Sequence, residues 1–270
     1  MGTEKVGFIG CGNMGSAMIN GIFSKNLLNS KDIYVYDQNT EKLNELCSEL
    51  NVNAAKSTID LAANCKYIIL AVKPYVCKPV LNELAPMLTA NNVIISIAAG
   101  VTVKALISAS KTDRVVRVMP NTPALVGEGA SAVVFNEKIN SDEQQFILEL
   151  LNTLGITCVV EEKLMDAVGA VSGSGPAYVY MFIEALADAG VLGGLDRQLS
   201  YKLAAQTVLG SAKMVIETGK HPGALKDDVC SPGGSTIEGV KSFEESGFRG
   251  AIIDAAVAVM NKTKKMAEEN

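Results

Sequence analysis

The sequence is poor in histidine, and its cysteines are not clustered. His221 is the one histidine, and no two of the six cysteines stand at Cys-x-x-Cys spacing. Structural zinc needs clustered Cys and His ligands, so we expect no zinc site. The cysteines fit small apolar side chains in a reducing compartment better than a disulfide framework. We therefore expect a cytoplasmic protein.

An excess of basic residues and a long apolar run are also missing. Lys and Arg number 24 against 29 Asp and Glu, which leaves a net charge of −5. A surface for nucleic acid or for an anionic membrane needs clustered positive charge. No apolar run approaches the roughly 18 residues of a membrane-spanning helix. The first residues carry neither a signal-peptide pattern nor a myristoylation motif. No nucleic-acid or membrane partner is expected.

The first part of the chain, residues 1–162, alternates short apolar runs with amphipathic helical patterns. Most runs are continuously apolar, which is typical of parallel strands covered on both faces. Helical patterns include Leu43 to Leu50 and a capping box at Ser141–Gln144. This part is predicted to be a Rossmann-type doubly wound α/β domain. Its predicted strands are 6–9, 33–36, 67–72, 93–97, 115–118, 132–135 and 156–160.

The second part, residues 163–270, has no strand pattern and is predicted to be an all-helical domain. Several of its helix faces carry small residues, which permit close packing, while the segment has few residues for a core of its own. We therefore expect a homodimer formed through these helices. The expected signals are a break at Gly173–Pro176, a helix at Ala177–Ala189, a cap at Asp196, helix ends at Gly219 and Gly247, and a last helix from about Arg249 to Met266.

The glycine motif Gly10-Cys11-Gly12-Asn13-Met14-Gly15 follows the first predicted strand and opens a helical pattern. In this context Gly10 allows a tight turn, Gly12 lets the backbone approach a pyrophosphate, and Gly15 lets the helix pack on the strand. The pyrophosphate would lie at the N–H groups of the helix start. A glycine turn without a ligand is the plainer interpretation.

Asp37 ends the second predicted strand, where a dinucleotide-binding fold carries the residue that contacts the adenosine ribose. A carboxylate accepts from the ribose 2′-hydroxyl and repels a 2′-phosphate, so Asp37 favours NADH over NADPH. Two alternatives remain open. Asn39, Thr40 and Lys42 follow at once and can surround a phosphate, and Asp37 can simply cap the next helix.

Later strand ends extend the expected site. Ala71-Val72-Lys73-Pro74 ends the third run, and ligands in open α/β sheets bind at the carboxyl ends of strands. Lys73 is placed to meet a cofactor, although a solvated surface charge is an equal alternative. The small residues Ala98 and Ala99 and the segment Met119–Pro123 leave room for a nicotinamide ring.

The catalytic inventory lacks an obvious proton donor, since His221 lies in a turn-like Lys-His-Pro-Gly segment. Carbonyl reduction usually needs such a donor, whereas a protonated C=N bond already accepts hydride. Ser231-Pro-Gly-Gly-Ser-Thr236 precedes a helical pattern at 236–245 and would present free N–H groups to a carboxylate. A helix cap with nothing bound is the alternative.

Five segments carry a family pattern, namely Ala71–Pro74, Met119–Pro123, Asp166–Tyr178, His221-Pro-Gly and Asp228–Thr236. Through them the sequence closely resembles the pyrroline-5-carboxylate reductases over essentially the whole chain. The resemblance implies reduction of L-1-pyrroline-5-carboxylate to L-proline by NAD(P)H at an active site shared between subunits. It also implies dimers that often assemble into rings of five.

The resemblance further implies roles for single residues. Thr236 would hydrogen-bond the substrate nitrogen, and Ser231, Gly234, Ser235 and Thr236 would hold its carboxylate, with Glu162 nearby. Asp228 would lie near the nicotinamide. The coenzyme residues expected are Phe8, Ile9, Gly10, Gly12, Asn13, Met14, Gly15, Asp37, Asn39, Thr58, Ala71, Val72, Lys73, Pro74, Ala98, Ala99, Asn121 and Asp228.

Two positions depart from the family pattern, and both bear on the choice of coenzyme. Thr58 stands where relatives often have Asn, and Asp37 differs from the polar or basic residue of NADPH-preferring members.

Two other functions are alternatives to this interpretation. A related imine or β-hydroxyacid reductase would turn over a keto acid, and a dinucleotide-binding regulator would need a partner surface that the charge pattern does not provide.

Overall fold

The structure, a computed structural model, describes residues 4–268, with side chains to 265. It forms two compact units. The first comprises the described residues 4–173 with 259–268, and the second is Ser174–Ala258. The predicted division after residue 162 stays a prediction.

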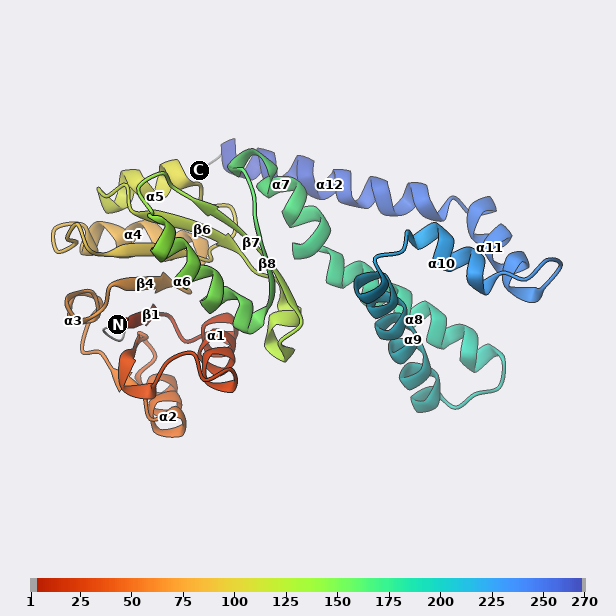
Figure 1. The fold of residues 1–270 in the computed structure, drawn as a ribbon, viewed down its shortest axis with the longest axis horizontal. Coiled ribbons are helices and arrows are strands. Elements are labelled where there is room, and N and C mark those ends of the chain that lie inside the picture. The colour runs from red at the N-terminus through yellow and green to blue at the C-terminus, as the bar shows by residue number, and fades with distance from the viewer. Residues whose placement is uncertain (1–3, 269–270) are drawn as a thin grey trace. The chain divides into compact units, whose positions relative to one another are not determined.

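An eight-stranded sheet forms the centre of the first unit, in the order β3-β2-β1-β4-β5-β6-β7-β8 (Figure 1). The order 3-2-1-4-5-6 is that of the doubly wound dinucleotide-binding fold, which confirms the predicted fold class. Each predicted strand is present within about three residues. The strands are β1 Val6–Ile9, β2 Ile33–Tyr36, β3 Asn53–Ala54, β4 Tyr67–Leu70, β5 Val93–Ser96, β6 Val115–Met119, β7 Gly129–Phe135 and β8 Gly155–Val159.

Three features of the sheet differ from prediction. β3 was not predicted, because its two residues, Asn53 and Ala54, form no apolar run. β7 pairs antiparallel with β6, so the sheet is not wholly parallel. β8 was predicted to be buried, yet Ile156 and Val159 are 64% and 59% exposed. As the outermost strand, β8 has a neighbouring strand on one side only.

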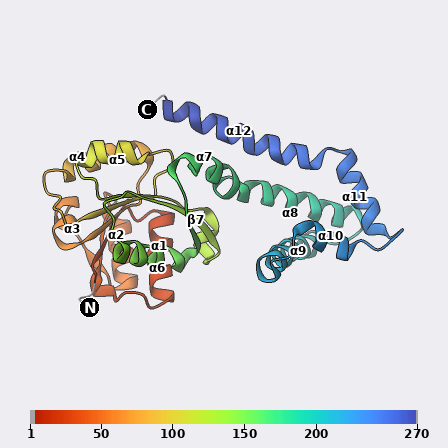
Figure 2. The ribbon, with the colours of Figure 1, turned by 45° about the horizontal axis from the view of Figure 1, so that its top comes forward.

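Helices cover both faces of the sheet (Figure 2). Alternate strand residues point to opposite faces, so Phe8 packs with α1, α2 and α6, while Ile9 packs with α3, α4 and α5. This unit has the helices α1 Asn13–Ser24, α2 Thr40–Leu50, α3 Thr58–Asn64, α4 Pro74–Leu84, α5 Val103–Ser110, α6 Ser141–Leu151 and α7 Met165–Val168, a π-helix Gly169–Gly173, and 3₁₀ turns Ser30–Asp32, Thr122–Val126, Asn152–Leu154 and Glu162–Leu164.

The capping box of α6 lies one residue earlier than predicted. Asn140, not Ser141, is the N-cap, and its Oδ1 accepts from the backbone N–H of Glu143 at 3.0 Å. The Glu143 Oε2 atom accepts from the N–H of Asn140 at 3.3 Å. Asn competes as well as Ser for an N-cap, so the sequence pattern alone did not separate the two positions.

The second unit is helical, as predicted, with no strand among its described residues. Asp196 caps α9 by accepting from the N–H of Leu199 at 3.0 Å, and Gly219 ends it at φ 63°, which confirms both signals. The predicted break at Gly173–Pro176 is present as a junction at Ser174, although Ser174 keeps helical backbone angles. The π-helix ends at Gly173, and α8 begins at Gly175 with Pro176 in its first turn, as predicted. Its helices are α8 Gly175–Leu192, α9 Arg197–Thr218, α10 Pro222–Val229, α11 Ser235–Glu245 and the first half of α12 Phe248–Glu268.

Most apolar side chains of this second unit are exposed. Only Ala187, Ser200 and Ala204 are buried among its described residues, while Leu192 and Ile216 are 90% and 78% exposed. Exposed apolar area on this scale is typical of a protein interface. Within residues 4–268 no helix has the length and apolar character that a membrane crossing requires.

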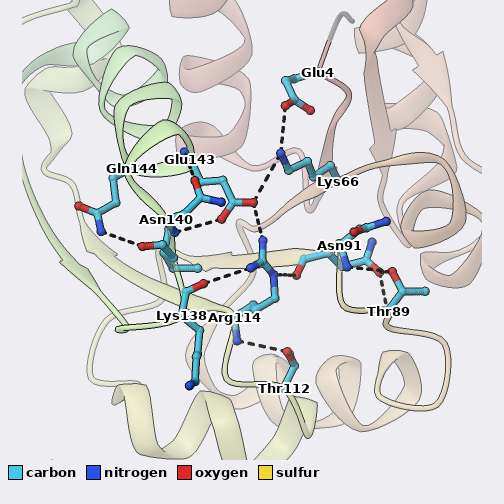
Figure 3. A network of polar contacts seen from close by, with 12 residues as sticks. Glu4, Lys66, Thr89, Asn91, Thr112, Arg114, Lys138, Asn140, Glu143 and Gln144 are labelled. Atoms are coloured by element: carbon cyan, nitrogen blue, oxygen red, sulfur yellow. Dashed lines mark hydrogen bonds and ion pairs between the residues drawn. The ribbon is translucent and has the colours of Figure 1, made fainter.

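A buried charge network holds the amino ends of the strands (Figure 3). Glu143 is 4% exposed and forms ion pairs with Arg114 and, at 3.5 Å, with Lys66. Lys66 precedes β4, Arg114 precedes β6, and Glu143 lies in the first turn of α6. The Arg114 Nη1 atom also donates to the carbonyl of Lys138 at 3.1 Å. One carboxylate therefore ties two strands to the helix that covers them.

Glu143→Gln tests this tie. The glutamine keeps the side-chain length and the capping-box acceptor, so the change removes the charge alone. Loss of one member of a buried ion pair costs about 3–5 kcal/mol, and the partly exposed partners reduce this to about 2–3 kcal/mol. We expect a clearly lower urea midpoint of unfolding. Exposed Glu149→Gln, on the same helix, is the control, and equal midpoints for the two variants would contradict the assignment.

Candidate functional site

The glycine loop between β1 and α1 contains glycines of two kinds. Gly10 has φ +99°, and a Cβ there would lie 2.5 Å from the carbonyl oxygen of Ala71. A Cβ on Gly15 would lie 2.4 Å from the carbonyl oxygen of Gly10. A Cβ on Gly12, by contrast, would meet nothing within 4 Å. The fold itself requires Gly10 and Gly15, whereas Gly12 keeps open a space that the chain does not use.

The N-terminus of α1 faces this space without a cap. Gly12 is the N-cap residue, no side chain accepts from the first-turn N–H groups, and the first turn carries no acidic residue. The first N–H groups of a helix have no acceptor within it, and the helix dipole adds partial positive charge there. A backbone that approaches closely and free N–H groups together form a site for a phosphate or pyrophosphate.

A cavity of about 680 Å³ opens at the carboxyl ends of the strands beside this helix end. Its size suits a large part of a dinucleotide. Ten residues of the predicted coenzyme set line it, namely Ile9, Gly10, Gly12, Asn13, Met14, Asp37, Thr58, Ala71, Val72 and Lys73. The remaining lining residues are Tyr36, Gln38, Val76, Val80, Glu83, Ile97, Pro120, Thr122 and Leu125.

Asp37 is fixed to the glycine loop. Its Oδ2 atom accepts from the backbone N–H of Cys11 at 2.8 Å and from the Cys11 thiol at 3.3 Å, and its Oδ1 atom accepts from the N–H of Asn39 at 2.8 Å. Burial alone would raise the pKa of Asp37, but these donors stabilise the carboxylate and hold the pKa below its ordinary value. Burial and the bond to Asp37 raise the pKa of the Cys11 thiol to about 12. A neutral thiol thus supports an ionised carboxylate at the cavity wall.

Asn39, not Asp37, caps the next helix. The side chain of Asn39 accepts from the N–H of Lys42 at 3.0 Å, so the capping alternative for Asp37 does not apply. Thr58 is 3% exposed, and its hydroxyl donates to Glu83 Oε1 at 2.6 Å. Lys73 is exposed at the start of α4.

Seven predicted coenzyme residues of this unit do not line the cavity. Phe8 and Gly15 are buried in packing, while Asn39 and Pro74 begin helices. Ala98 is buried and Ala99 exposed. Asn121 donates to the carbonyl of Ser172 at 3.0 Å and accepts from the N–H of Ala130 at 2.8 Å, which ties the end of β6 to its neighbours.

Part of the lining was not predicted, although the spacing of three residues indicates it. Val80 and Glu83 lie four and seven residues after Val76, so the three side chains share one face of α4. Because α4 begins directly after Lys73, this face continues the predicted site. Pro120 and Thr122 lie within the segment that was noted for its small and rigid residues.

In the second unit, the Ser231–Thr236 segment forms a tight turn before α11. The N–H of Gly234 donates to the carbonyl of Ser231 at 3.0 Å, and Gly233 has φ +69°. Gly234 is the N-cap of α11 and provides no side-chain cap, and Ser235 and Thr236 are exposed in the first turn. This helix end therefore offers free N–H groups and hydroxyl donors to a small anion.

Glu162 and Asp228 already have partners. The Glu162 Oε1 atom accepts from the N–H of Val103 at 2.7 Å and from the nearly buried Arg117 at 3.1 Å. Asp228, on α10, forms an exposed ion pair with Lys220 at 3.2 Å. Their predicted places beside the substrate and the nicotinamide stay predictions.

Two family models match the chain. Residues 162–266 match the model described as pyrroline-5-carboxylate reductase dimerisation, and residues 5–100 match one described as NADP oxidoreductase, coenzyme F420-dependent. The first match covers most of the helical part, and the second covers the glycine loop and the first five strands.

Whole-length relatives agree with the model of the helical part. A pyrroline-5-carboxylate reductase of Escherichia coli is 46% identical over 98% of this chain and 99% of its own length. The enzyme of Glycine max is 41% identical over 97% and 96%. The solved structure of Plasmodium falciparum pyrroline carboxylate reductase with NADP bound is 38% identical over 99% of both chains, with a TM-score of 0.87. That of Coxiella burnetii is 33% identical over 97% and 98%, with a TM-score of 0.93. The chain belongs to the pyrroline-5-carboxylate reductase family.

Proposed function

We propose that this NAD(P)H-dependent oxidoreductase reduces L-1-pyrroline-5-carboxylate to L-proline by means of two uncapped helix ends. The observation that carries the proposal is the pair of anion sites at the starts of α1 and α11, each reached through a glycine turn without a side-chain cap. A dinucleotide brings a pyrophosphate, and the substrate brings a carboxylate. Each anion matches one helix end.

The residues of the first unit fit the coenzyme. The N–H groups after Gly12 hold the pyrophosphate, Asp37 meets the adenosine ribose, and Lys73 adds a positive charge at the cavity wall. The other end of the cavity, at Pro120 and Thr122, leaves room for the nicotinamide, and Ala98 and Ala99 follow the neighbouring strand. When bound, the dihydronicotinamide supplies the hydride.

The residues of α11 hold the substrate. The N–H groups of Ser235 and Thr236, with the Ser231 hydroxyl, bind the carboxylate, and Gly234 keeps the turn open. The Thr236 hydroxyl hydrogen-bonds the ring nitrogen and so fixes the C=N bond in one orientation. The resemblance gives Glu162 a place near the substrate and Asp228 a place near the nicotinamide.

A protonated imine explains why the chain needs no strong acid at this site. The iminium is already electrophilic, so orientation supplies most of what the protein must provide. His221 is exposed, and its Nδ1 accepts from the N–H of Gly223 at 3.0 Å as the N-cap of α10. Because His221 already caps α10, we assign the hydrogen bond to the substrate nitrogen to Thr236.

A keto-acid reductase is the competing enzyme. Such an enzyme needs a proton donor at the carbonyl oxygen, and the α11 turn offers hydroxyl groups but no His, Lys or Tyr in its first turn. A regulator that binds the dinucleotide without turnover is excluded by family membership. Turnover of pyrroline-5-carboxylate with no turnover of a keto acid separates the two enzymes.

Thr236→Ala tests the assignment on α11. Loss of one hydrogen bond to a charged group costs about 1.5–3 kcal/mol, so kcat/KM for pyrroline-5-carboxylate should fall by roughly ten- to a few-hundredfold. Thr236→Ser should restore most of the rate, and exposed Ser242→Ala, further along the same helix, should match the wild type. Steady-state kinetics measure all three variants, and a wild-type rate in Thr236→Ala would disprove the role.

We further propose that the chain prefers NADH to NADPH because Asp37 stays ionised. Asp37→Asn removes the repulsion of a 2′-phosphate. The amide oxygen can still accept from Cys11, and the bond from the N–H of Asn39 is lost, which affects both coenzymes alike. The kcat/KM ratio for NADH over NADPH should fall at least about tenfold, which corresponds to about 1.4 kcal/mol of lost repulsion. Because the pKa of Asp37 is lowered and a phosphate monoester has a second pKa of about 6, both groups stay fully charged above about pH 7, and the wild-type preference should not change between about pH 7 and 9.

Exposed Asp113→Asn is the control for this change of charge. A wild-type ratio that favours NADPH, or a ratio that Asp37→Asn leaves unchanged, would contradict the proposal. The Plasmodium falciparum relative, whose structure has NADP bound, is the natural enzyme for comparison.

The match to a dimerisation model and the exposed apolar helices of the second unit support a homodimer. The resemblance extends this to a ring of five dimers. Sedimentation velocity at micromolar concentration should give a species of ten chains of 28.4 kDa each, or of two if the dimer does not assemble further. A monomer would contradict both.

A further inference from the structure

The adenosine side of the cavity contains a polar pair that the proposed reaction does not use. Thr58 begins α3 and Glu83 lies in the last turn of α4, and both line the cavity together with Asp37. The Thr58 hydroxyl donates to Glu83 Oε1 at 2.6 Å. Thr58 is 3% exposed, so its surroundings fix it, while Glu83 is exposed.

Apolar side chains lie beside this pair. Val76 and Val80 stand on the same face of α4 as Glu83, and Tyr36 ends β2 next to Asp37. All three line the cavity. A flat base joined to a ribose at Asp37 would meet apolar side chains on its faces and the Thr58–Glu83 pair at its edge.

The pair presents hydrogen-bond acceptors only. A carboxylate has no donor, and the single proton of Thr58 is already given to Glu83. Adenine has acceptors at its ring nitrogens and one donor group, the exocyclic amine. The exocyclic amine is therefore the one group of the base that can form a hydrogen bond with this pair.

We propose that Glu83, held in place by Thr58, accepts a hydrogen bond from the exocyclic amino group of the coenzyme's adenine and so selects adenine over a purine base that lacks this amine. This inference rests on the proposed coenzyme site. Glu83 is a specificity residue in direct contact with the coenzyme, and Thr58 is a positioning residue that acts through Glu83.

The plainer interpretation is a tie between α3 and α4 without contact to the coenzyme. The two interpretations differ in one measurable property. Loss of a tie weakens the binding of every dinucleotide alike, whereas loss of a contact to the amine changes the ratio between dinucleotides that differ only at that group.

Equilibrium binding without substrate provides the test. NADH and reduced nicotinamide purine dinucleotide differ only in the base, where a hydrogen replaces the amine and the ring nitrogens stay acceptors. The wild type should bind NADH about tenfold more tightly, because the analogue loses one hydrogen bond to a charged group. Isothermal titration calorimetry gives both dissociation constants.

The variants separate the two residues. Glu83→Gln should lower the ratio in part, because a neutral amide oxygen accepts a weaker hydrogen bond from the amine than a carboxylate does. Glu83→Ala should bring the ratio close to one, and Thr58→Val should reduce it in part. Glu137→Gln removes the same charge at a residue outside the cavity and should keep the wild-type ratio.

A wild-type ratio near one, or an unchanged ratio in Glu83→Gln, would overturn the inference, and equal weakening of both ligands would establish the helix tie. Because no pyrroline substrate is present, failure of the proposed reaction does not affect this result. If the wild type binds neither dinucleotide, the coenzyme site itself is refuted, and this inference with it.

Discussion

The structure of the first unit depends on the close approach of three backbone segments at the ends of β1 and β4. Gly10 and Gly15 have no room for a side chain, because carbonyl oxygens of Ala71 and Gly10 lie where a Cβ would be. This packing fixes the start of α1 and leaves the space beside Gly12 free. The proposed site for the pyrophosphate therefore follows from how helix and sheet must pack.

Charge is divided between the two ends of the sheet. At the amino ends, the buried Glu143 pairs with the partly exposed Arg114 and Lys66, and this network holds strands and helix together. At the carboxyl ends, the cavity presents the carboxylates of Asp37 and Glu83 and the exposed Lys73. The first end stabilises the fold, and the second presents charges to a cavity, as is usual for open α/β sheets.

The sequence predicted seven of the eight strands, the glycine loop and the turn before α11, because each depends on residues close together in the chain. It did not predict the antiparallel direction of β7 or the exposure of β8, since an apolar run specifies neither direction nor neighbours. The Thr58–Glu83 bond joins residues 25 positions apart, and Arg117 with Glu162 joins residues 45 apart. Such pairs follow from the three-dimensional packing and leave no local pattern.

A crystal structure with oxidised coenzyme and proline would show where the two anions bind. We expect the pyrophosphate against the N–H groups that follow Gly12, and the proline carboxylate against those of Ser235 and Thr236. A pyrophosphate bound away from the α1 terminus, or a proline carboxylate bound away from α11, would refute the role of the two helix ends.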